Sequence, residues 1–259
     1  MLERLREIYE YRYTIVGLVK RDLRGRYKGS ALGFLWNLVV PVCQILVYIM
    51  VFTQVMRYNV PNYYLFLVVA MMPWLTFTEC MMQGAGSIVG QSALVSKIYF
   101  PNEIIPLSTV IARFINLFLT SIIIFILIFA GGFGVNVEAL VYLPLVVVIE
   151  FVMALGITLI LAALTVYFRD LQYIVQVALM AGVWVTPVLF EPSMVEGFLA
   201  SLLNINPLSP IIMAYRSILF YQQIPELSGL WCAAIFAIVQ LVIAEIIFRK
   251  LEPEFAEQI

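Results

Sequence analysis

Four ionisable side chains lie inside long apolar stretches of this sequence: Glu79, Arg113, Glu150 and Glu245. A charged group costs free energy in hydrocarbon, so it normally faces a partner or a water-filled cavity. We expect Arg113 to be neutralised by Glu79 or by Glu245. Glu150 has no obvious basic partner, so it is either protonated or faces an interior cavity, with proton transfer as the less favoured alternative.

Several kinds of chemistry are excluded by what the sequence lacks. It contains no histidine, which removes Ser-His-Asp and Cys-His catalysis and the metal sites that need imidazole. It has no G-x-x-x-x-G-K-[ST] motif for cradling nucleotide phosphates. The glycine cluster at residues 84–90 is interpreted as a hinge. The three cysteines stand singly in apolar runs and are read as buried thiols. We therefore predict no catalytic, metal or cofactor site in this chain.

The composition places these side chains in a lipid bilayer. Apolar residues make up 63% of the 259 residues and charged residues only 12%, whereas soluble domains have about 45–50% and about 25%. The net charge of −1 argues against nucleic-acid binding, which would need a basic excess. The predicted fold class is an all-α membrane protein that forms a single transmembrane domain over residues 1–259.

Six stretches are long and apolar enough to cross a bilayer, which takes about 20 residues in a helix. We predict six transmembrane helices at residues 32–56, 63–83, 104–130, 141–167, 173–190 and 229–248. With the N-terminus inside, most basic residues fall on the cytoplasmic side, and only Arg57 and Arg216 lie outside. Both termini are therefore expected to be cytoplasmic, in a multi-pass membrane protein.

Residues 1–28 are basic and have apolar residues at roughly helical spacing. Their short apolar run, which more basic residues follow, does not fit a secretory signal peptide. We predict a cytoplasmic amphipathic helix on the inner leaflet. It is either a simple anchor or also a surface that attracts anionic lipid head groups.

The segment of about residues 192–228 is expected on the outer side. Residues 197–205 and 208–221 are apolar but too short to cross, and prolines interrupt them. Short re-entrant helices between spans five and six fit this pattern if protein or water satisfies their backbone. Two interfacial helices that lie flat on the membrane are the alternative.

Aromatic side chains within or near the ends of the spans suit sugar rings, whose C–H faces are apolar. Packing between helices is the commoner use of such residues, and composition does not select between the two. The candidates for a glycan channel are Trp36, Tyr48, Phe52, Trp74, Phe77 and Trp184.

Four segments together resemble one family, the membrane-spanning permease subunits of ABC exporters for bacterial surface polysaccharides (O-antigen, capsule and teichoic acid). They are RDLRGRYKGSALGFLW at residues 21–36, VSKIYFPNEIIPLS at 95–108, YFRDL at 167–171 and NPLSPIIMAYR at 206–216. Their order, the six expected spans and the length agree with that family over essentially the whole chain.

This resemblance implies a homodimer joined to two copies of a separate ABC ATPase subunit, which would bind ATP and Mg. The loop at about residues 84–106 would couple to the ATPase, and an ordinary interfacial loop is the alternative. The coupling candidates are Ser96, Lys97, Ile98, Tyr99, Phe100, Pro101 and Glu103 in this loop, with Arg169 and Asp170 in the next.

The expected cargo is an undecaprenyl-pyrophosphate-linked polysaccharide, similar to O-antigen, that leaves the cytoplasm across the inner membrane. Its pyrophosphate would be gathered by Arg21, Arg24, Arg26 and Lys28. The alternatives are an ABC permease for teichoic acid, drugs or smaller lipids, and less favoured, an ion-coupled carrier or channel or a membrane enzyme acting on lipid-linked sugars.

Overall fold

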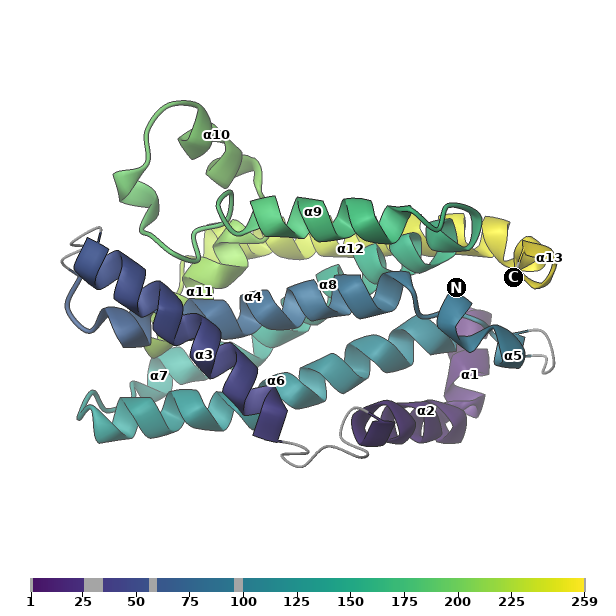
Figure 1. Ribbon diagram of the computed structural model, residues 1–259, viewed down its shortest axis with the longest axis horizontal. Helices are drawn as coiled ribbons and strands as arrows, with labels where there is room; N and C mark the ends of the chain where they lie inside the picture. The colour runs from purple at the N-terminus through teal and green to yellow at the C-terminus, as the bar shows by residue number, and fades with distance from the viewer. Residues whose placement is uncertain (1, 26–34, 56–59, 96–99, 259) are drawn as a thin grey trace.

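The structure is a computed structural model that describes residues 2–25, 35–55, 60–95 and 100–258. These residues form helices joined by turns, and no strand occurs among them, as the sequence predicts. The long helices run side by side and make an elongated bundle (Figure 1).

The N-terminal helices form an amphipathic segment, as the sequence predicts, while its cytoplasmic position on the inner leaflet stays a prediction. Helix α1 spans Leu2–Glu10 and helix α2 spans Arg12–Gly25. Leu18 and Val19 of α2 are buried, whereas its basic side chains are exposed. Leu18 packs in a small cluster with Phe100 and residues at the start of α6, and Figure 1 shows α2 beside that helix.

Within the part of the chain that the structure describes, four helical segments are long and apolar enough to cross a membrane: Tyr63–Ala85, Ile104–Ala130, Val137–Tyr167 and Leu227–Glu254. They correspond to helix α4, helix α6 (both with these bounds), α7 (Val137–Leu140) with α8 (Leu143–Tyr167), and α12 (Leu227–Leu251) with its extension. The most buried of the four is α4, which packs against α6, α8, α3, α9 and α11. The second, third, fourth and sixth predicted spans are therefore helices of sufficient length.

The first and fifth predicted spans are shorter helices than expected. Helix α3 covers Trp36–Met50 and continues as a π-helical turn over Val51–Val55, while α9 covers only Leu171–Gly182. Turns follow α9 from residue 183, and the proline at position 187 prevents the helix from continuing through that point. A full set of six spans thus stays a prediction.

Two short helices follow α9, as the prolines predict. Helix α10 spans Phe198–Ile205 and α11 spans Ser209–Leu219, and the pair is bent by 83°. At the bend, the Asn206 amide donates to the Val185 carbonyl at 2.8 Å and to the Thr186 hydroxyl at 2.9 Å, while its Oδ1 accepts from the Leu208 amide. The pair fits either a broken span or a re-entrant loop.

The bundle has two ends that differ in what they carry. The end with both termini, the short helix α5 (Ser92–Val95) and residues 100–103 and 167–170 is here called the terminal end (Figure 1). The opposite end, called the far end, holds residues 131–142, 183–197 and 221–226. There the Gln222 amide donates to the Phe133 carbonyl at 2.5 Å, and the Tyr221 hydroxyl donates to Glu191.

Helices α8 and α12 pack closely because Gly156 leaves room for the neighbouring backbone. A Cβ atom on Gly156 would lie 3.1 Å from the Cα of Leu241 and 2.9 Å from the side-chain Nε2 of Gln240. Few real Cβ contacts are this short, and one of the atoms belongs to the backbone. Small residues at such positions allow helices to approach in membranes.

We predict that Gly156→Ala lowers the free energy of unfolding by about 1–3 kcal/mol, because the two helices must separate. The matched control is Gly17→Ala on α2, where a Cβ meets nothing within 4 Å. It should be neutral or stabilising by about 0.5–1 kcal/mol. Circular dichroism during unfolding in mixed detergent micelles measures both, and equal effects would contradict the close approach.

Candidate functional site

The segment before α6 is held at the terminal end by both the N-terminal and C-terminal parts of the chain. The Asn102 amide donates to Glu252 at 2.9 Å, and the buried Glu103 carboxylate lies 4.0 Å from the Arg249 side chain. Phe100 is buried against α2. The structure thus fixes three of the predicted coupling residues, Phe100, Pro101 and Glu103, between α2, the start of α6 and the end of α12. The other coupling residues predicted in this loop lie outside the described residues: Ser96, Lys97, Ile98 and Tyr99.

The second loop at this end is short and projects outward. Arg169 and Asp170 are exposed, and the preceding Phe168 is 68% exposed. Its base is fixed because the Tyr167 hydroxyl donates to the Leu251 carbonyl at 3.0 Å and to Glu254 at 3.1 Å. The sequence analysis did not single out Phe168. This places an exposed aromatic side chain beside two charged ones on a short loop whose base is fixed.

The basic side of α2 lies next to the first loop. The Arg21 guanidinium donates to the Gln91 side chain at 2.6 Å, and Arg24 is exposed. Arg26 and Lys28 lie outside the described residues. A cavity of about 350 Å³ lies between α2, α4, this loop and α6, with Arg21, Gln83, Gln91 and Ser108 among its lining residues. The cavity brings a guanidinium together with neutral hydrogen-bonding groups and with the carboxylate of Asp22, which pairs with Arg113.

Arg113 ties three helices together through ion pairs. Its side chain is 1% exposed, and its guanidinium pairs with Asp22 of α2 and, at 3.5 Å, with Glu79 of α4. The predicted neutralisation by Glu79 is confirmed. Asp22 was not foreseen, and Glu245 pairs with Arg249 instead. A buried charge with two carboxylate partners fixes α2 against the bundle, because separation of α2 would remove one of the two carboxylates that neutralise it.

Glu150 has a neutral partner in the middle of the bundle. Its side chain is fully buried, and the Tyr215 hydroxyl donates to its Oε2 at 2.6 Å. This partner was not predicted from the sequence, because Glu150 and Tyr215 lie 65 residues apart in the chain. The bond joins α8 to α11 and holds the second short helix against the core.

Arg216, the next residue of α11, is also fully buried. Its guanidinium donates to the Val188 carbonyl at 2.9 Å and lies 3.6 Å from the centre of the Phe66 ring. The Tyr63 hydroxyl donates to the Leu189 carbonyl at 2.8 Å. The turns after α9 are therefore bound to both α4 and α11.

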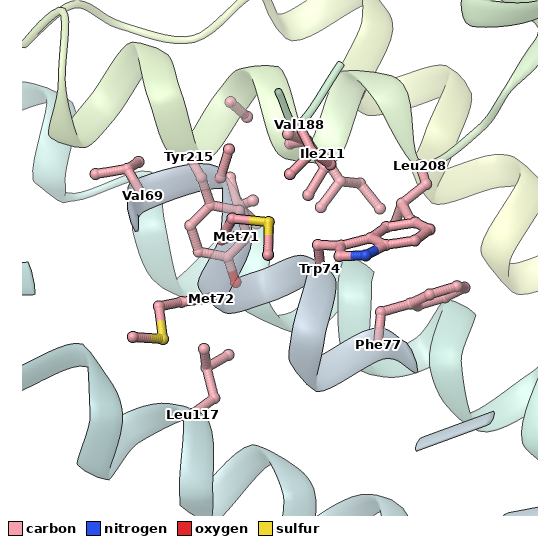
Figure 2. Packing of buried hydrophobic residues seen from close by; sticks show 14 of the residues in the cluster. Val69, Met71, Met72, Trp74, Phe77, Leu117, Val188, Leu208, Ile211 and Tyr215 are labelled. Carbon is pink, nitrogen blue, oxygen red and sulfur yellow. The ribbon is translucent and has the colours of Figure 1, made fainter. Parts of the chain in front are cut away.

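The predicted channel aromatics differ in how far they are buried. Phe52, Trp74 and Phe77 are buried: Phe52 stacks on Tyr63, and Trp74 stacks on Phe77 with ring centres 6.4 Å apart. Figure 2 shows the Trp74 and Phe77 rings within the core, near Leu208. Tyr48 is half-buried, whereas Trp36 and Trp184 are 46% and 51% exposed. Within one copy of the chain, three of the six rings are thus packed in the core, whereas two lie on its surface.

Comparison with protein families agrees with this arrangement. The family model described as "ABC-2 type transporter" matches residues 13–220, which include α2, both terminal-end loops and α11. The chain belongs to the ABC-2 type transporter family.

Curated relatives of this ABC-2 chain resemble it over nearly their whole length. It is 36% identical to the O-antigen export system permease protein RfbA of Myxococcus xanthus, over 100% of both chains. It is 28% identical to a Klebsiella pneumoniae protein of the same name, over 94% of this chain and 93% of that one. It is 24% identical to the polysialic acid transport protein KpsM of Escherichia coli, over 92% and 93%.

We predict that Arg113→Met in the ABC-2 chain lowers stability by about 3 kcal/mol, because it leaves two carboxylates together without their cation. Amide hydrogen exchange should also become faster across α2, since Asp22 loses its partner. The matched control is Arg6→Met, which removes the exposed Arg6–Glu10 pair and should leave stability unchanged. Unaltered exchange in α2 of Arg113→Met would show that the ion pair does not hold this helix.

Proposed function

We propose that this chain is the permease subunit of an ATP-driven exporter for a bacterial surface polysaccharide of the O-antigen type. The observation that carries the proposal is the 36% identity, over the full length of both chains, to an O-antigen export permease. The polysaccharide would travel attached to a polyprenyl pyrophosphate lipid whose tail stays in the bilayer.

In this proposal six spans cross the inner membrane, with the terminal end in the cytoplasm and the far end outside. The distribution of basic residues supports the orientation, because α2 and the last turn of α12, both at the terminal end, carry many of them. Helices α4, α6, α8, α9 and α12 also alternate in direction between the two ends (Figure 1). Helices α3 and α9 complete the six passes together with the residues that follow them.

Two copies of the chain would form the conduit, and two ATPase subunits would bind its terminal end with their ATP and Mg. The terminal end is suited to receive a push because Phe100, Asn102 and Glu103 contact α2 and the end of α12. A displacement of the first loop would therefore be passed directly to α2, to the end of α12 and to α6, which follows the loop. The exposed Phe168, Arg169 and Asp170 supply a second contact.

The lipid pyrophosphate would be gathered by the basic side of α2. Arg21 lines the cavity between α2 and the bundle, and Arg24 is exposed on the same helix. Charged donors of this kind form strong hydrogen bonds with phosphate oxygens. Arg26 and Lys28 would add to the same surface. The sugar chain would pass between the two copies along the exposed rings of Trp36 and Trp184, because aromatic faces hold sugar rings without fixing one register.

We predict that the purified chain forms a complex with an ABC ATPase subunit from the same strain and that the complex exports lipid-linked glycan from reconstituted vesicles only when ATP is present. Phe168→Ser should weaken ATPase binding at least about tenfold, which corresponds to about 1.4 kcal/mol of lost apolar contact. Sedimentation measures the complex, and glycan protection from an added glycosidase measures export.

The matched control is Phe198→Ser, since Phe198 is 79% exposed at the far end. It should leave ATPase binding unchanged. Transport by the chain without any ATPase, or equal binding by the two variants, would overturn the proposed coupling.

We predict that Arg24→Gln reduces stimulation of ATP hydrolysis by lipid-linked glycan several-fold while leaving the basal hydrolysis rate unchanged. The reason is the loss of one charged donor to phosphate at an exposed position. Arg12→Gln is the control, because this guanidinium lies over the Tyr9 and Tyr13 rings at the start of the same helix. Equal stimulation curves for both variants would remove Arg24 from the head-group site.

A further inference from the structure

A second cavity of about 350 Å³ lies at the far end, between the α10–α11 pair, the turns before it and the start of α12. This volume is at the lower end of the range of small-molecule sites, about 300–1,000 Å³. We call it the far-end pocket. No step in the proposed export mechanism so far uses it.

One buried hydroxyl in the wall of this pocket has no partner. Ser209 is 8% exposed, and its Oγ is shielded from solvent without a hydrogen bond. Buried hydroxyl groups are normally paired, because an unpaired one costs roughly 1–3 kcal/mol. A rotation of the Ser209 side chain toward the cavity would let a ligand in the pocket bond to this hydroxyl and remove the cost.

The rest of the wall combines polar groups with apolar surface. Asn204, Ser217 and Glu226 supply an amide, a hydroxyl and a carboxylate, while Pro210 and Met213 supply apolar faces. Together with Ser209, these groups can donate to and accept from several hydroxyls placed around one ring. The apolar faces suit the C–H surface of that ring. This combination is typical of a site for a sugar residue.

The charge of the wall selects among sugars. Glu226 is its acidic residue, and no Lys or Arg is found among the described residues that line it. An ionised carboxylate accepts hydrogen bonds from sugar hydroxyls but repels carboxylate-bearing sugars. The pocket therefore favours neutral or amino sugars over uronic and sialic acids.

The pocket is also held in shape by contacts outside its wall. Asn206 fixes the turn between α10 and α11, and Arg216 fixes α11 against the Val188 carbonyl. At the start of α12, a Cβ atom on Gly229 would lie 3.3 Å from Cβ of Pro210, so the two helices nearly touch there. A site that is already formed loses less free energy to ordering when it binds.

From this geometry we propose that the far-end pocket binds one neutral or amino sugar residue of the exported polymer on the outer side of the membrane. The inference rests on the proposed function, because the polymer is its source of sugar. Ser209 and Glu226 make the decisive hydrogen bonds, and the apolar wall holds the ring face.

The test uses the purified full chain in lipid nanodiscs, without ATPase or nucleotide. The probe is the oligosaccharide that mild acid releases from the surface polysaccharide of the strain that encodes the chain. A second probe is the same oligosaccharide after oxidation of its primary hydroxyls to carboxylates. Saturation-transfer NMR measures binding of each, and sn-glycerol 3-phosphate is added as a soluble stand-in for a lipid head group.

We expect the native oligosaccharide to bind more tightly than the oxidised one. Ser209→Ala should raise the Kd of the native probe roughly 3- to 10-fold, as the loss of one neutral hydrogen bond predicts. Glu226→Gln should narrow the difference between the two probes. The control is Ser201→Ala on α10, whose hydroxyl donates to the Gly197 carbonyl at 3.4 Å and which does not line the pocket.

Ser209→Ala should unfold at the same temperature as the wild type or higher, because it removes an unpaired hydroxyl, so weaker binding by this variant cannot be attributed to misfolding. The proposal is overturned if neither probe binds, if the oxidised probe binds as tightly as the native one, if Ser209→Ala matches Ser201→Ala, or if glycerol phosphate displaces the oligosaccharide. Export is measured separately with the ATPase, so a functional exporter with an empty pocket refutes only this inference.

Discussion

Burial of positive charge is the constraint on which the terminal end depends. Arg113 lies in a helix that is otherwise almost wholly apolar, and its side chain is 1% exposed. A lone guanidinium there would cost several kcal/mol. Its two carboxylates come from α2 and α4, so neutralising one charge also determines where the amphipathic helix lies. The cavity beside Arg21 and the packing of Phe100 on Leu18 both follow from that position.

The far end meets the same constraint with a different set of partners. The turns after α9 have backbone carbonyls without helical donors, and such groups need other partners in a membrane. Arg216 supplies them, since its guanidinium donates to the Val188 carbonyl and also lies over the Phe66 ring. One buried cation thus stabilises an irregular segment that would otherwise be unfavourable. In return, the carbonyls and the ring lower the cost of burying that cation.

The sequence predicted the parts of the structure that depend on local pattern. Hydropathy located α4, α6, α8 and α12, helical spacing located α2, and prolines located the bent pair. The pairing of Arg113 with Glu79 was also foreseen, because few charges were available inside the spans. Asp22 and Tyr215 were missed because their partners lie 91 and 65 residues away, so only tertiary packing brings them together. Exposed Phe168 was missed for a related reason: its exposure depends on how Tyr167 fixes the loop.

The contacts at the two ends indicate how a displacement of the first loop at the terminal end would be transmitted to the far end. At the terminal end, the first loop is bonded to the end of α12 through Glu252, and α6 follows it directly. These two helices should therefore move together when the loop is displaced. At the far end, α12 begins against Pro210 of α11, but α11 is bonded to α8 and to the turns after α9 through Tyr215 and Arg216. A displacement of α12 relative to α8 would consequently change the far-end pocket, because the pocket wall includes both α11 and the start of α12. If the pocket binds sugar, its affinity for sugar then depends on the position of the terminal end. A sugar residue would be released when that affinity falls, so the polymer could move on rather than remain bound.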